Sequence, residues 1–188
     1  MNWNQILNWK LLDGSHKFPG PDGGTCINEA AIVAAGFEYH SVSSAADCPP
    51  CFSRVLAAYA ISLNDQLPDD LRQELLMPFV TRLAGTADAP AIERQRFDFI
   101  MLGLVRTVLP ISLRGWKDDL AMECERVTHY DDAIAAVNKI DVARARDLAR
   151  ASVVLLDGAM KIGKQAEPIE TEIVVGRLAK ILKLELTE

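Results

Sequence analysis

Apolar residues recur at helical spacing along most of this chain, and no run shows the alternation of apolar and polar residues that marks a half-buried strand. Residues 51–67, for example, place Val55, Leu56, Tyr59 and Leu63 on one face of a helix. Further helices are expected at residues 1–12, 26–35, 68–83, 90–110, 115–129, 131–158 and 169–186. The sequence therefore predicts an all-α fold, a single compact domain of six to eight short helices with a C-terminal helical extension.

Glycine and proline interrupt this pattern at two places. Residues 13–25 contain six of them, which excludes a regular element, and residues 37–50 form a second loop that ends at Pro49 and Pro50. Gly36 is expected to end the 26–35 helix, and Pro78 to kink the 68–83 helix. We expect residues 1–110 to form a helical body with the loops, and residues 111–188 an extension that packs on it or mediates homodimer formation.

The charge balance excludes several classes of protein. The 188 residues carry a formal net charge of -6, and residues 1–90 hold 10 acids against 5 bases. An acidic chain without clustered cations is a poor binder of nucleic acid or of an anionic membrane. The longest apolar stretches are too short to span a bilayer, and the N-terminus lacks the basic and apolar regions of a signal peptide. A cytoplasmic protein is therefore expected.

Cysteine and histidine gather in the two loops. Cys48 and Cys51 have the C-x-x-C spacing that lets two thiolates reach one tetrahedral ion, and Cys26 opens a helix whose N-terminus favours a thiolate. His16 lies in the first loop and could fold back toward Cys26. These residues predict a structural zinc site with the ligands His16, Cys26, Cys48 and Cys51, and His40 competes as the fourth ligand.

Other interpretations of the same residues remain open. The thiols could be small buried apolar groups, or Cys48 and Cys51 could be a redox-active dithiol. Cys26 could also be the nucleophile of a thiol hydrolase, because its position at a helix start resembles that in papain-like enzymes. The hydrolase would take its base from His40 or His129, and its orienting group from Asp22, Asn28 or Asp47.

Two further patterns favour plain structure. Residues 158–164 have the G-x-x-x-x-G-K spacing of a phosphate-binding loop, but Gln165 stands where a magnesium-binding hydroxyl is needed. Glu125, His129 and Asp132 would share one face of a continuous helix and could hold a metal, although an exposed polar stripe is commoner. We interpret the first pattern as a helix end and the second as a solvated surface.

Several short motifs resemble a family of short, functionally uncharacterised bacterial proteins found in actinobacterial genomes and beside prophage-type genes. The similarity covers about residues 12–110 and leaves the C-terminal extension outside. It is carried by these positions: His16, residues 22–26, Glu29-Ala30, Ala35-Gly36, Cys51, Ser53, Asn64-Asp65, residues 67–69, Arg72 and residues 83–86. The resemblance implies a helical body and a mobile-element setting. Relatives carry histidine in place of Cys48, which suits a metal ligand better than a disulfide.

Two classes of function follow. The first is a non-enzymatic module that binds another protein and is stabilised by zinc; a mobile-element inhibitor of host defence, such as an anti-CRISPR protein, is its concrete form. An acidic surface could then occupy a site meant for nucleic acid. The second is a cysteine-dependent hydrolase with Cys26 as nucleophile. The two differ at Cys26, which should be unreactive in the first and readily alkylated in the second.

Overall fold

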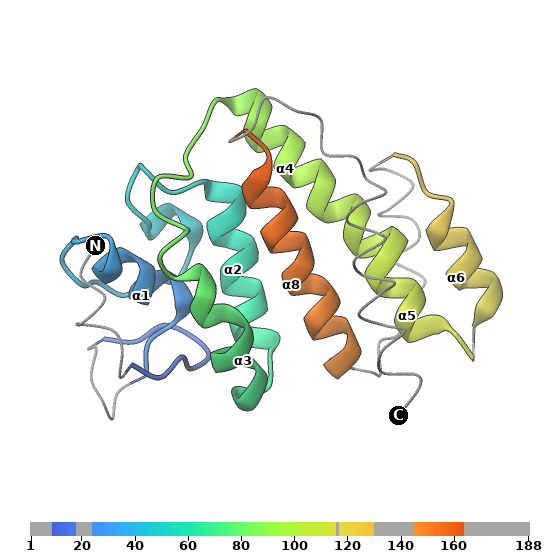
Figure 1. Ribbon diagram of the computed structural model, residues 1–188, viewed down its shortest axis with the longest axis horizontal. Coiled ribbons are helices and arrows are strands. Elements are labelled where there is room, and N and C mark those ends of the chain that lie inside the picture. Colours follow the sequence, from blue (N-terminus) through green and yellow to red (C-terminus); the bar gives the residue numbers. More distant parts are fainter. Residues whose placement is uncertain (1–8, 18–23, 116, 130–144, 164–188) are drawn as a thin grey trace. The chain divides into compact units, whose positions relative to one another are not determined.

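A computed structural model describes residues 9–17, 24–115, 117–129 and 145–163, and within these ranges the all-α prediction is confirmed. The chain divides into two compact units, Met1–Arg94 and Gln95–Glu188. The division falls inside one helix, whereas the sequence suggested a boundary at residue 110. The described residues form helices joined by turns and irregular segments; the β pairing among them is one isolated bridge, and the helices are labelled in Figure 1.

The first unit is built around a helix that is buried on every side. Helix α1 spans Ile27–Ala34, and all eight of its residues are buried, including two polar ones, Asn28 and Glu29. It packs on α2 (Arg54–Gln66), which in turn packs on α3 (Asp69–Leu76) and on the short 3-10 helix η2 (Ala45–Asp47). A helix without a solvent-facing side must satisfy its polar groups internally, and this requirement shapes the site described below.

Proline and capping residues set the helix ends. Helix α2 begins at Arg54, three residues later than its apolar pattern suggests, because the Ser53 hydroxyl caps it by accepting a hydrogen bond from the Leu56 amide at 3.2 Å. Helix α3 ends at Leu76, and Pro78 lies in the 3-10 turn Met77–Phe79 that follows. Proline thus ends the helix there rather than kinking it.

The N-terminal segment departs from the helix predicted for residues 1–12. Residues 1–8 lie outside the described residues, and the segment from Lys10 to Leu12 is extended. It pairs with Thr25, whose carbonyl accepts a hydrogen bond from the Leu12 amide and whose amide donates to the Lys10 carbonyl, both at 3.1 Å. A tertiary partner therefore overrides the local helical pattern.

The second unit is a set of packed helices. Helix α4 (Pro90–Gly103), of which the last part belongs to this unit, continues through the π-helix Leu104–Val108 into α5 (Leu109–Leu113), and α6 spans Asp118–Glu125. Pro110 has no N–H and cannot donate a hydrogen bond to the preceding turn. Just before it, the Leu109 amide donates to the Leu104 carbonyl, in the wider pattern of a π-helix. A buried cluster joins these helices: Val105, Leu113, Ala121, Cys124 and Val127.

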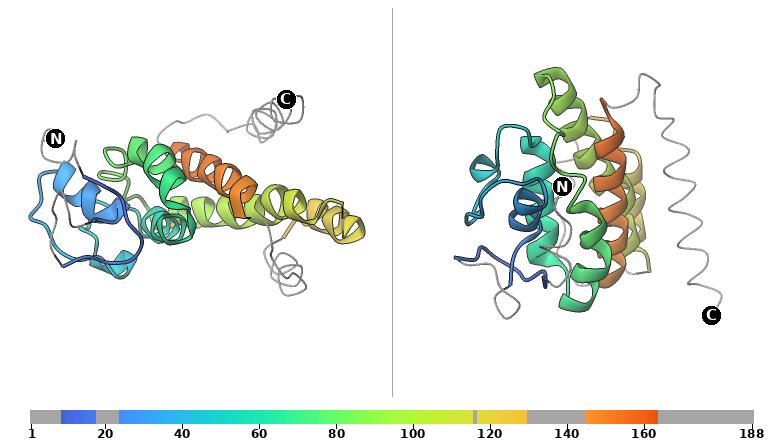
Figure 2. Two further views of the ribbon diagram at one scale, coloured as in Figure 1. Left: turned by 90° about the horizontal axis from the view of Figure 1, so that it is seen from below. Right: turned by 60° about the vertical axis from the view of Figure 1, so that its left-hand side comes forward.

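Helix α8 (Ala145–Lys161) lies antiparallel to the α4–α5 rod, as Figures 1 and 2 show. Gly158 faces the ring of Phe99 and Gly103 faces Leu155, so that one glycine on each helix allows the close approach. The Arg96 guanidinium is buried and donates to the Ile162 carbonyl at 2.9 Å, at the end of α8.

Gly158→Ala is expected to destabilise the protein by about 1–3 kcal/mol, although alanine ordinarily stabilises a helix interior by about 1 kcal/mol relative to glycine. The reason is steric: a β-carbon at this position would lie 2.7 Å from two atoms of the Phe99 ring. Denaturant unfolding followed by circular dichroism measures the change. A variant more stable than the wild type would contradict the close approach of the two helices.

Candidate functional site

The carboxylate of Glu29, in the first turn of α1, is the centre of a network of hydrogen bonds. Cys26 is the N-cap of this helix, and the Cys26 and Glu29 side chains form a reciprocal capping box with each other's backbone amides. The Cys26 amide donates to Glu29 Oε2 at 2.8 Å, and the Glu29 amide donates to Cys26 Sγ at 3.4 Å. The N-cap geometry thus brings the glutamate back toward the start of the helix.

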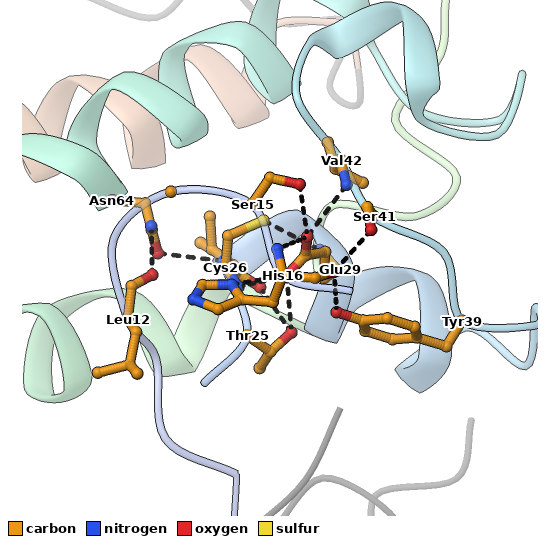
Figure 3. A network of polar contacts seen from close by, with 12 residues as sticks. Leu12, Ser15, His16, Thr25, Cys26, Glu29, Tyr39, Ser41, Val42 and Asn64 are labelled. Atoms are coloured by element: carbon orange, nitrogen blue, oxygen red, sulfur yellow. Dashed lines mark hydrogen bonds and ion pairs between the residues drawn. The ribbon is translucent and has the colours of Figure 1, made fainter. Parts of the chain in front are cut away.

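Two loop segments bind the same carboxylate, as Figure 3 shows. From the first loop, the His16 amide donates to Oε1 at 2.9 Å and the His16 ring places Nδ1 3.1 Å from Oε2. From the second loop, the Val42 amide donates to Oε1 at 3.0 Å. Two hydroxyls complete the set, those of Ser15 and Thr25, each at 3.3 Å. Glu29 thereby joins both loops to α1; we call these groups together the Glu29 network.

The hydrogen bonds keep this buried carboxylate ionised. Burial alone would raise the pKa of Glu29, but hydrogen bonds from the backbone of His16, Cys26 and Val42 and from the His16 ring outweigh it and hold the pKa below its ordinary value of about 4.5. The network therefore stabilises the fold above pH 4.5, and this contribution is lost as the pH falls through the lower pKa of the folded state.

A second set of contacts holds the loops to each other. The Tyr39 hydroxyl and the Ser41 hydroxyl both donate to the His16 carbonyl, at 2.8 and 2.7 Å. The Tyr39 ring meets the edge of Trp9, with ring centroids 6.3 Å apart. Burial and the nearby charge of Glu29 raise the pKa of Tyr39, so that its hydroxyl stays a donor.

Asn64 ties the same region to α2. Its side-chain oxygen accepts from the Ile27 amide at 3.1 Å, which satisfies a free donor at the start of α1. Its side-chain nitrogen donates to the Leu12 carbonyl at 2.8 Å. The fully buried Asn64 therefore fastens the extended N-terminal segment and α1 to one point on α2.

The Cys26 thiol has a structural environment. It is 1 % exposed, and burial together with the charge of Glu29 raises its pKa to about 12. The His16 ring pairs with Glu29 instead of the thiol. Asn28, an orienting group in the hydrolase hypothesis, donates to the Ala57 carbonyl at 2.9 Å. A neutral, buried thiol without a base is a poor nucleophile.

The four predicted zinc ligands do not come together as the predicted site requires. All four lie in the described part of the chain, yet within it no group of three or more His, Cys, Asp or Glu residues is placed to hold a metal ion. His16 pairs with Glu29, Cys26 caps α1, and Cys48 and Cys51 lie in the loop before α2. The competing ligand, His40, has Nε2 2.8 Å from the Asp47 carbonyl oxygen. The zinc site stays a prediction, and the geometry lends it no support.

The remaining sequence candidates do not assemble into sites either. Helix α6 ends at Glu125, so His129 is not on a continuous helix with it, and Asp132 lies outside the described residues, as does Asp22. Residues 158–161 are the last turn of α8 and not a phosphate-binding loop. The structure thus confirms the interpretation of the 158–164 pattern as a helix end.

Glu29 and Asn64 belong to the site but were not predicted from the sequence to be functional residues. The signal for Glu29 was present, because a capping side chain followed three residues later by glutamate is a known N-terminal pattern. Here the capping residue is cysteine, so the sequence does not match the common form of the pattern, which has serine or threonine at that position. Nothing in the sequence marks Val42, whose contribution is a backbone amide.

Comparisons with known proteins identify no relative: no family model, no curated protein and no solved structure matches the chain. Among the described helices, none combines the length and apolar character that crossing a bilayer requires. The resemblance to the prophage-associated bacterial family stays a prediction.

Proposed function

We propose that this chain is a non-enzymatic protein-binding module whose binding surface is the pair of loops held by Glu29. The observation that carries the proposal is the Glu29 network itself: one buried carboxylate fixes two irregular segments, and its nearest thiol and imidazole are both engaged in structure. Loops ordered before binding lose little conformational entropy when a partner docks.

The loop surface, residues 14–17 and 37–41, presents side chains suited to a protein partner. Phe37 is 45 % exposed, and Tyr39 is half-buried beside Trp9. Aromatic residues are enriched at protein interfaces, where they bury large area at low entropic cost. The same segments carry exposed polar residues, among them Lys17, His40 and Ser41. Aromatic and polar side chains together are the composition expected of such an interface.

A mobile-element inhibitor of host defence, in the manner of an anti-CRISPR protein, is the narrower form of this proposal. It would act in the cytoplasm on a nucleic-acid-binding protein. Exposed acidic residues at the junction of α2 and α3, among them Asp65, Asp69 and Glu74, suit a partner with a cationic surface. Structural zinc is not needed for the proposal, because hydrogen bonds already hold the loops.

Cys26 is expected to resist alkylation in the folded protein. Its buried thiol should react with iodoacetamide more than about a hundredfold more slowly than the half-buried Cys51 of the same chain, because the thiolate is the reactive form. Peptide mass spectrometry after timed labelling measures both rates, and labelling in denaturant is the control. Rapid, selective labelling of Cys26 would instead support the hydrolase.

Binding should depend on Phe37. Affinity capture from the source organism is compared for the wild type, Phe37→Ser and Met122→Ser, since Phe37 and Met122 are the two large exposed apolar residues of the described chain, at 45 % and 40 %. We expect the wild type and Met122→Ser to capture similar amounts of a partner. Phe37→Ser should capture at least about tenfold less, because it lacks one interface anchor. Equal retention by all three proteins would overturn the assignment of the loop surface.

A further inference from the structure

Cys48 and Cys51 flank two prolines in the loop between η2 and α2, and the backbone there has a defined shape. Cys48 is extended, with φ -71° and ψ 149°. A single turn follows, in which the Phe52 amide donates to the Pro49 carbonyl at 3.0 Å. The chain therefore reverses direction between the two cysteines, within the C-x-x-C spacing at which two thiols can reach one another.

The same chain holds two other extended residues whose side chains contact the residue three positions later. Ser44 is extended before η2, and its hydroxyl lies 3.2 Å from a carboxylate oxygen of Asp47, three residues later. Cys26 is extended before α1, and its capping box joins it to Glu29, again three residues later. Cys48 shares the extended conformation of Ser44 and Cys26, and Cys51 follows it at the same spacing, although an isolated turn stands here in place of a helix.

Both cysteines are fixed through their own carbonyls. The Arg54 guanidinium donates to the Cys48 carbonyl at 2.6 Å, and the Ala87 amide donates to the Cys51 carbonyl at 2.9 Å. Between them and α2, the side chain of Phe52 is 1 % exposed and anchors the turn in the core. These contacts hold the backbone of the turn at both cysteines, and the C-x-x-C spacing separates the two by only two residues.

The two thiols differ in access to solvent. Cys48 is 3 % exposed, whereas Cys51 is half-buried, and the other two cysteines, Cys26 and Cys124, are fully buried. All four are free thiols. A C-x-x-C pair with one reachable and one buried thiol is the arrangement in which the first reacts with an external disulfide and the second resolves the product.

We propose that Cys48 and Cys51 form a reversible dithiol–disulfide pair, in which Cys51 reacts first with a low-molecular-weight disulfide such as oxidised glutathione. The Cys51 thiolate attacks one glutathione sulfur, forming a mixed disulfide and releasing one glutathione thiolate. The Cys48 thiol then loses its proton to solvent and attacks the Cys51 sulfur, releasing the second glutathione. The two cysteines lose two electrons and two protons in total, and one oxidised glutathione becomes two reduced ones.

The second step depends on pH, because the Cys48 thiolate is the attacking group. Burial raises the pKa of the Cys48 thiol to about 11, an effect that the positive charge of Arg54 opposes and the negative charge of Asp47 reinforces. Ring closure is therefore expected to speed up as the pH rises from 7 to 9, in proportion to the thiolate fraction. The pair does not depend on what the loop surface binds, so it stands apart from the proposed function.

The test is a titration of the full-length protein with mixtures of reduced and oxidised glutathione, followed by acid quenching, alkylation and mass spectrometry. The expected product has lost about 2 Da, with Cys48 and Cys51 protected together and Cys26 and Cys124 still alkylated after unfolding. Dithiothreitol should restore both thiols. The Cys48→Ser variant should stop at a mixed disulfide, a gain of about 305 Da on Cys51. The Cys124→Ser variant is the control and should behave as the wild type.

Three results would overturn the proposal. The first is a mixed disulfide on Cys51 that never closes in the wild type. The second is a disulfide to Cys26 or Cys124. The third is a pair of thiols that become reactive only after a chelator is added, which would establish the predicted metal site in its place.

Discussion

Glu29→Gln is expected to lower the free energy of unfolding of the first unit by about 3 kcal/mol, the scale for breaking a buried charged hydrogen-bond network. The amide would keep one acceptor oxygen but would turn an N–H₂ group toward donors, since both carboxylate oxygens accept hydrogen bonds, including those from the Cys26 and Val42 amides. At least one buried amide or hydroxyl would then lack its partner. Denaturant unfolding at pH 7 measures the loss.

The matched control is Glu74→Gln, the same change on the exposed surface of α3, which should alter stability by less than about 0.5 kcal/mol. The pH dependence gives a second, independent readout. Because the pKa of Glu29 is lowered in the folded state, the difference between wild type and Glu29→Gln should be constant above pH 4.5 and shrink below it. A difference that persists unchanged at pH 3 would show that the charge of Glu29 is not what stabilises the loops.

Arg72→Met is expected to lower the free energy of unfolding by about 3 kcal/mol, because it removes the donor that satisfies the carbonyl groups at the C-terminal end of α2. The guanidinium is 3 % exposed and donates to the Asn64 carbonyl at 2.5 Å and the Leu67 carbonyl at 2.7 Å. Methionine fills similar volume but leaves these carbonyls without that donor. The partner carboxylate of Asp69 is 68 % exposed, so the ion pair itself contributes little.

Substitution by lysine distinguishes the contribution of the charge of Arg72 from that of its planar guanidinium group. Arg72→Lys keeps the positive charge but lacks the planar fork that reaches two carbonyls at once, so it should recover less than half of the lost stability. The control is Arg106→Met in the second unit, an exposed position where a change below about 0.5 kcal/mol is expected. Full recovery with lysine would show that charge, and not the two carbonyl contacts, is what α2 requires.

Several elements of the fold were predictable from the chain because their signals are local. The helix predicted for residues 26–35 is α1 with its two caps, since the apolar run and Gly36 are sufficient to define it. Pro90 likewise marks the start of α4. Local signals failed where a distant group or an unusual helical turn intervened. Thr25 draws the segment from Lys10 to Leu12 into an extended conformation, and a helix continues past Pro110 because a π turn accommodates the proline.

The candidate site shows the same division. The sequence alone determined that the chain is helical, acidic and interrupted by two loops that contain or adjoin three cysteines and two histidines, because periodicity and composition are properties of neighbouring residues. The partners of His16 and Cys26 were decided only by the tertiary structure. Burial of α1 on all sides leaves Glu29 without water, and backbone amides from two loops replace it. Backbone amides are the same at every residue, so no sequence pattern could single out the ones that a buried carboxylate would bind.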